Sequence, residues 1–71
     1  MIRLGLHIRL TRREAERLYW LTDIEPVDIR TPADLDAYVA RCKAHYWGCS
    51  RDTQFLHWLI DQERARLDTA A

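Results

Sequence analysis

The first ten residues alternate between apolar side chains and polar or small ones. The apolar positions are the even ones: Ile2, Leu4, Leu6, Ile8 and Leu10. Successive side chains of a strand point to opposite faces, so this period of two predicts one amphipathic strand over residues 2–10. A single strand leaves its backbone N–H and C=O groups unpaired. We therefore expect the strand to pair across a homodimer, with Leu4, Leu6, Ile8 and Leu10 in the seam.

The pattern changes to that of a helix after Thr11. Thr11 and Glu14 have the spacing of a capping box, in which each side chain accepts a hydrogen bond from the other residue's backbone N–H. They predict a helix over residues 12–22. Residues 23–30 contain Pro26, which is unsuited to a central strand, so we expect an ordered connection there, with a short edge strand as the alternative.

Two further helices are expected, over residues 32–47 and 51–67. Thr31 is a suitable N-cap for the first and Ser50 for the second. Helical spacing predicts a core stripe on the earlier helix at Leu35, Tyr38, Val39, Cys42 and Tyr46. The later helix carries a wide apolar arc of Phe55, Leu56, Leu59, Ile60 and Leu67. The predicted fold class is α+β and mostly helical, with one N-terminal strand followed by three helices.

Composition predicts a protein that buries part of its surface against a partner. With 71 residues the chain suffices for one domain, expected over residues 1–69, with 70–71 as a frayed tail. Yet 48% of the residues are hydrophobic, including three Trp and three Tyr. So small a monomer cannot easily hide this much apolar surface, whereas association with a second copy or another protein would bury it.

Charge and residue usage exclude several function classes. The formal net charge is zero, so no overall field attracts nucleic acid or a membrane. The chain has neither an apolar run of membrane-spanning length nor the apolar core of a signal peptide, so we expect a cytoplasmic protein with Cys42 and Cys49 reduced. Gly5 and Gly48 are the only glycines, which leaves no glycine-rich phosphate loop. We expect neither enzymatic activity nor a cofactor, because no nucleophile and base form a recognisable arrangement.

The motif Leu6-x-Ile8-x-Leu10-Thr11, followed by a helix with Glu16 and Leu18, resembles the ribbon–helix–helix family of DNA-binding proteins. The segment 31–46 is similar to the second helix of that family. The resemblance implies a dimeric transcription regulator whose paired strands lie in the major groove of double-stranded DNA.

Residue roles follow from the same resemblance. It implies that Arg3, His7 and Arg9 face the base edges and that Thr31, at the start of a helix, lies against phosphate. A solvated strand face explains Arg3, His7 and Arg9 equally well without any DNA. Both interpretations stay open at this point.

A second pattern is similar to the helix-turn-helix motif. It consists of Ala44, Gly48, Cys49, Ser50 and Thr53. The small residues would let two helices cross closely, and Ser50 would cap the recognition helix. A turn between two packed helices explains the same residues without DNA.

Cys42, His45, Cys49 and His57 are residue types that zinc could bind together. Their spacing matches no common zinc finger, and Cys42 also falls on the predicted core stripe. A buried thiol with imidazoles at the surface is the favoured interpretation, so we predict no metal site.

The alternative function belongs to another class, a non-enzymatic module that binds a larger protein. A phage-type inhibitor, such as an anti-CRISPR protein, or an antitoxin-like partner would be examples. The candidate surface consists of Tyr19, Trp20, Tyr46, Trp47 and Trp58. Aromatic residues are enriched at interface hot spots, but they also fill cores, and we expect about three of the five to be buried in the core.

Overall fold

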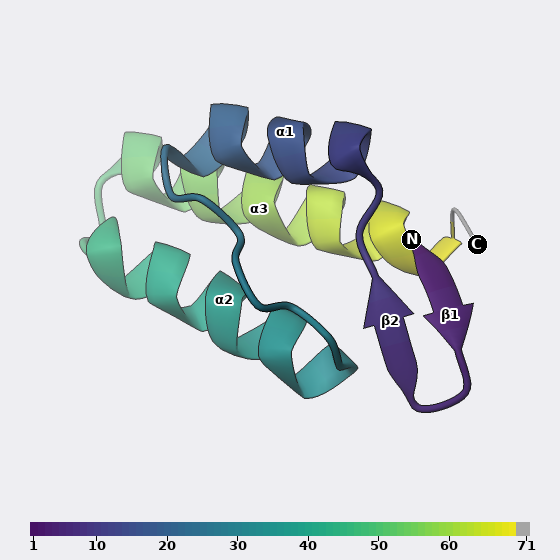
Figure 1. Ribbon diagram of the computed structural model, residues 1–71. Coiled ribbons are helices and arrows are strands. Elements are labelled where there is room, and N and C mark those ends of the chain that lie inside the picture. Colours follow the sequence, from purple (N-terminus) through teal and green to yellow (C-terminus); the bar gives the residue numbers. More distant parts are fainter. Residues whose placement is uncertain (70–71) are drawn as a thin grey trace.

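A computed structural model describes residues 1–69, which form two short strands and three helices. In chain order these elements are β1 Ile2–Leu4, β2 His7–Arg9, α1 Arg12–Thr22, α2 Pro32–His45 and α3 Arg51–Thr69 (Figure 1). The expected helices are confirmed, although α2 ends earlier and α3 ends later than predicted. The expected frayed tail at 70–71 lies outside the described residues.

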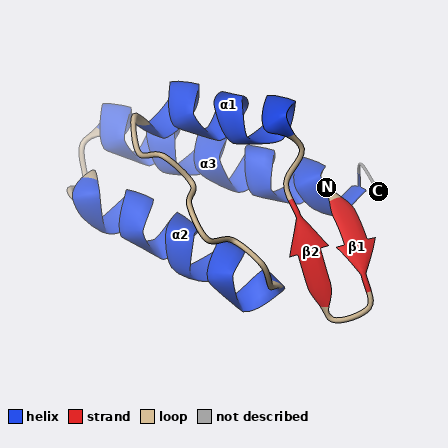
Figure 2. Ribbon diagram, in the orientation of Figure 1, coloured by secondary structure: helices blue, strands red, loops and turns tan. Residues whose placement is uncertain are grey.

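The first ten residues form a hairpin, so the prediction of one continuous strand over residues 2–10 is wrong (Figure 2). β1 pairs antiparallel with β2, with Leu4 opposite His7. Gly5 and Leu6 form the loop, and Gly5 has a φ of 65°, a left-handed conformation that glycine adopts without strain. The strand pairing that was expected from a second copy is therefore made within the chain.

The two-residue loop also changes which side chains face the core. Opposite residues of an antiparallel pair point to the same face, so Leu4 shares the outer face with His7. Leu4 is 64% exposed and Leu6 is 87% exposed, so neither belongs to the core of its own chain. Their expected place in a dimer seam stays a prediction. Ile8 is buried and Leu10 packs against the core, but the core is that of their own chain.

Two capping boxes set the starts of α1 and α2. Thr11 accepts a hydrogen bond from the backbone N–H of Glu14, whose carboxylate accepts one from the N–H of Thr11 at 2.8 Å. Thr31 and Asp34 make the same exchange at the start of α2, each bond 3.1 Å long. These local bonds satisfy N–H groups that have no partner within the helix.

α1 and α2 both pack on α3, which runs the length of the helical body (Figure 1). The core brings together the hairpin and all three helices, through Met1, Ile8, Leu18, Leu35, Tyr38, Cys42, Ile60 and Leu67. The predicted core stripe of α2 is confirmed. None of the helices in the described part of the chain is both long enough and apolar enough to cross a membrane.

Polar groups in the core are hydrogen-bonded. Thr22 is fully buried, and its hydroxyl donates to the Leu18 carbonyl at 2.8 Å. The Tyr38 hydroxyl lies 2.8 Å from that of Thr22 and donates to the Ile24 carbonyl at 2.7 Å. Burial raises the pKa of Tyr38. The network holds the start of the connection 23–30 against α1 and α2.

The connection 23–30 contains no strand in the structure, so the expected ordered connection is confirmed. Ile24 and Ile29 pack against the core, which fixes both ends of the segment. At its end the Arg30 carbonyl accepts a hydrogen bond from the N–H of Ile8 in β2, at 2.8 Å. The hairpin is thereby joined to the start of α2.

Candidate functional site

The four residues predicted to contact DNA do not share one surface. His7 and Arg9 are exposed on the outer face of the hairpin. Arg3 lies opposite Ile8 in the register and so points to the other face, where its guanidinium pairs with the Asp68 carboxylate at 3.1 Å. The expectation that Arg3 points outward beside Arg9 is wrong, because the loop places the two on opposite faces of the hairpin.

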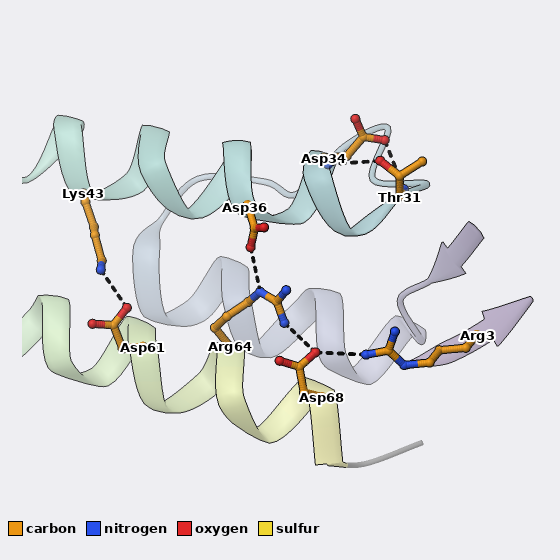
Figure 3. A network of polar contacts seen from close by, with 8 residues as sticks. All are labelled: Arg3, Thr31, Asp34, Asp36, Lys43, Asp61, Arg64 and Asp68. Carbon is orange, nitrogen blue, oxygen red and sulfur yellow. Dashed lines mark hydrogen bonds and ion pairs between the residues drawn. The ribbon is translucent and has the colours of Figure 1, made fainter. Parts of the chain in front are cut away.

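Thr31 is already engaged as the N-cap of α2 (Figure 3). The Asp34 carboxylate accepts the N–H groups of Arg30 and Thr31, both at 3.1 Å. The hydrogen bond from Arg30, with those from Thr31, lowers the pKa of Asp34, which is therefore ionised at neutral pH. A phosphate bound at this end of α2 would have to occupy the position that the Asp34 carboxylate already takes.

Ion pairs along α3 fix the neighbouring elements (Figure 3). Arg64 lies between Asp36 of α2, at 3.2 Å, and Asp68, at 2.7 Å. Burial lowers the pKa of Arg64, but the two carboxylates outweigh it and raise the pKa overall. Asp68 also binds Arg3, so this cluster joins α2, α3 and the hairpin and serves as structural support.

The aromatic residues proposed for a partner surface are mostly exposed. Trp20 is 88% exposed, Trp47 82% and Trp58 54%. Tyr19 is also exposed, and only Tyr46 is half-buried, donating to the Thr22 carbonyl at 2.5 Å. The expectation that about three of the five lie in the core is therefore wrong.

A hollow of about 550 Å³ lies along the seam between α1 and α3. α1 lines it with Arg13, Glu16, Arg17, Trp20 and Leu21. α3 lines it with Leu59, Gln62 and Glu63. Trp20, Leu21 and Leu59 supply its apolar surface, and charged side chains form its rim.

Phe55 and Trp58 extend this apolar surface along α3. Their rings stack with centroids 5.9 Å apart and planes at 17°. Phe55 precedes Leu59 by one helical turn and so lies on the same side of α3. Phe55 belongs to the wide apolar arc predicted for this helix, yet it is 60% exposed. The predicted arc was wider than the surface that one neighbouring helix can cover. This width was the feature of the sequence that could have indicated an exposed residue on the arc.

A second hollow continues the first toward the start of α1. The two share Arg13, Arg17 and Glu63, and the second adds Arg66 and Leu67 of α3. We call the two hollows together the α1–α3 trough. Its end near Trp20 is aromatic, and its other end is rich in arginine.

Glu14 lines the arginine-rich end of the trough and contacts the amino group of Met1. Partial burial raises the pKa of the Glu14 carboxyl, but the bonds to Met1 and Thr11 outweigh it and lower the pKa overall. The Glu63 carboxylate pairs with Arg17 at 3.5 Å and with Arg66 at 3.4 Å. Both acids at this end are thus neutralised by cations of the same chain.

The remaining sequence patterns have structural roles. Among residues 1–69, no group of three or more His, Cys, Asp or Glu side chains is placed to hold a metal ion. Cys42 is buried in the core, and a ring nitrogen of His57 lies 2.8 Å from the Tyr46 carbonyl. Ser50 accepts the N–H of Thr53 at 3.2 Å, as expected of the N-cap of α3.

Comparison of the chain with protein-family models, with curated proteins and with solved structures found no match. The resemblance to the ribbon–helix–helix family therefore rests on its residues alone. Of the elements that it implied, the helices beginning at Arg12 and Pro32 are present, and the unpaired strand is not. Whether the chain binds DNA stays a prediction.

Proposed function

We propose that this chain is a non-enzymatic module that binds a larger protein through the α1–α3 trough. The observation that carries the proposal is an apolar hollow lined by the exposed Trp20 and rimmed by arginine, with the exposed, stacked rings of Phe55 and Trp58 on the part of α3 that leads to Leu59. Trp and Arg are the residue types that most often dominate binding energy at protein interfaces. A phage-type inhibitor or an antitoxin-like partner would act in this way, by covering a surface of another protein.

The exposed area supports a partner of ordinary size. The chain exposes 5315 Å², whereas a monomer of 8.5 kDa is expected to expose about 4,700 Å². This excess of roughly 600 Å² is surface that a partner can cover, and a standard interface takes about 800 Å² from each side. Covering the ring of Trp20 is expected to contribute about 1.5–3 kcal/mol, before the cost of association is subtracted.

The test compares two tryptophans of similar exposure, Trp20 at 88% inside the trough and Trp47 at 82% outside it. Wild-type protein and a Trp20→Ser variant are used as baits in extract from the native cell, with Trp47→Ser as the matched control. A retained protein is purified, and its affinity for each bait is measured by calorimetry. We expect the trough variant to lose at least about tenfold in affinity, or about 1.4 kcal/mol, and the control to keep it. Equal losses, or a loss confined to the control, would contradict the proposal.

Binding of duplex DNA is the competing outcome of the test. A DNA-binding regulator would retain random duplex DNA at low salt, release it steeply as salt rises, and bind less after Arg9→Ala. DNA binding of this kind, without any protein bound through the trough, would replace the proposed function with the ribbon–helix–helix prediction.

A further inference from the structure

We infer that the α1–α3 trough takes an amphipathic helix of the partner whose polar flank is acidic, an inference that rests on the proposed function. α1 and α3 run antiparallel (Figure 1), and residues of both helices line the trough. Two neighbouring helices form a groove in which a third helix packs by its apolar ridge. Trp20 and Leu59 lie at one end of this groove to receive apolar side chains.

The charges around the trough favour an acidic occupant. Glu16 is paired with Arg12 at 3.2 Å, and Glu63 is shared between Arg17 and Arg66. Arg13 lines both hollows with an exposed side chain, and no carboxylate among residues 1–69 is paired with it. Three arginines and three glutamates line the trough, and each glutamate, including Glu14 with the Met1 amino group, is already paired with a cation. A glutamate or aspartate of the occupant would therefore find its partner in Arg13.

Acidic side chains on the rim favour a helix over nucleic acid. Glu16 and Glu63 line the same hollow as Trp20. A phosphate backbone carries a charge at every nucleotide and would pass close to both carboxylates. A helix instead can place an acid near Arg13 and apolar or neutral side chains near the glutamates, because its side chains differ along the ridge.

The probes are three synthetic amphipathic peptides of about 18 residues, long enough to form a helix on binding. They share one pattern of leucines on the apolar face and carry glutamate, glutamine or lysine on the flanks. Affinity is measured by calorimetry and by the fluorescence of the chain's tryptophans. We expect the glutamate peptide to bind at least about tenfold more tightly than the lysine peptide, with the difference shrinking as salt rises.

Arg13→Glu is the decisive variant. Arg13 lies in the first turn of α1, where an acid suits the helix dipole, so the variant is expected to fold. We expect it to abolish or invert the preference for the glutamate peptide. The matched control is Arg9→Glu, an equal charge change on the outer face of the hairpin, which is expected to leave the preference unchanged. Trp20→Ala is expected to weaken all three peptides alike.

Each other result overturns the inference in a distinguishable way. Equal binding of the three peptides, or tighter binding of the lysine peptide, rejects the acidic helix, while a natural partner lost on Trp20→Ser would still support the proposed function. Tight binding of single-stranded oligo-dT in place of the peptides would assign the trough to nucleic acid. A dimer in sedimentation that buries the tryptophans would assign it to a second copy. Failure of peptides and native extract together rejects both proposals.

Discussion

Aromatic side chains lie on two sides of α1, and the two sides are built differently. On the side toward α2, the ring of Tyr38 is buried and that of Tyr46 is half-buried, and both hydroxyls bind the backbone. On the side of the trough, Trp20 and Phe55 cover part of the surface but remain largely in water. α1 therefore borders a closed seam on the side toward α2 and an open one on the side of the trough.

The difference shows how much core a chain of this size can close. Tyrosine on the closed side brings a hydroxyl that the backbone of residues 22–24 can satisfy, so its burial leaves no unpaired polar group. A small domain can enclose only a limited volume. The packing of α1 against α2, and of both against α3, fills that volume. The remaining large rings stay outside, where another molecule can cover them.

The largest expected effect is a difference in the free energy of unfolding between variants on the two sides of α1. Tyr38→Ala should lower the free energy of unfolding by about 3–5 kcal/mol, because it opens a cavity in the core. Trp20→Ala should change it by no more than about 0.5 kcal/mol, because its ring is exposed. Chemical denaturation followed by circular dichroism measures both. Losses of similar size would show that the trough is part of the folded core rather than a surface held open.

A smaller effect isolates the hydroxyl of the closed side. Tyr38→Phe keeps the ring but removes the group that binds Thr22 and Ile24, and should cost about 1–2 kcal/mol because buried polar atoms lose a partner. Tyr19→Phe is the matched control at an exposed ring and should stay within about 0.5 kcal/mol. Unfolding in urea gives both values. If Tyr38→Phe were neutral, packing alone would explain why the seam is closed.

The smallest expected effect is the pH dependence of the stability that the Thr31–Asp34 capping box provides. The pKa of Asp34 is lowered from its ordinary value of 3.8 by the N–H groups of Arg30 and Thr31. Its stabilisation is therefore fully present above that ordinary value and is lost as pH falls through the lower pKa of the folded state. We expect Asp34→Asn to melt at a lower temperature than wild type at neutral pH. The two melting curves should converge in strong acid. A difference that persists there would assign the effect to geometry rather than to charge.

Local patterns predicted the helices well because their causes are local. The capping boxes at Thr11 and Thr31 act within one turn, and both are present as expected. The hairpin was missed because Gly5 with Leu6 is a weak turn signal, and a strict alternation through it has the same appearance as one long strand. Across a two-residue loop the side chains that face the core change from odd-numbered to even-numbered positions. Leu4 is therefore exposed although Ile8 is buried, and Leu6 is exposed in the loop itself.

The candidate site was only partly predictable. Trp20 and Trp58 were identified as possible partner contacts because aromatic residues often serve this purpose. Which rings would be covered depends on how α1 and α3 cross, and periodicity does not contain that information. For this reason the predicted apolar arc did not indicate that Phe55 would stay exposed. The sequence pattern also contains no indication that α3 lies beside Arg13 and Arg17.

The position of α3 in the chain affects how the protein forms during synthesis. Ile60 and Leu67 complete the core, yet they are made after every residue that they cover. While the ribosome still holds α3, Leu18, Leu35 and Tyr38 lack the part of the core that α3 supplies, so the emerging helices stay open to chaperones and proteases. Folding of this chain is therefore expected to finish only after α3 has left the exit tunnel.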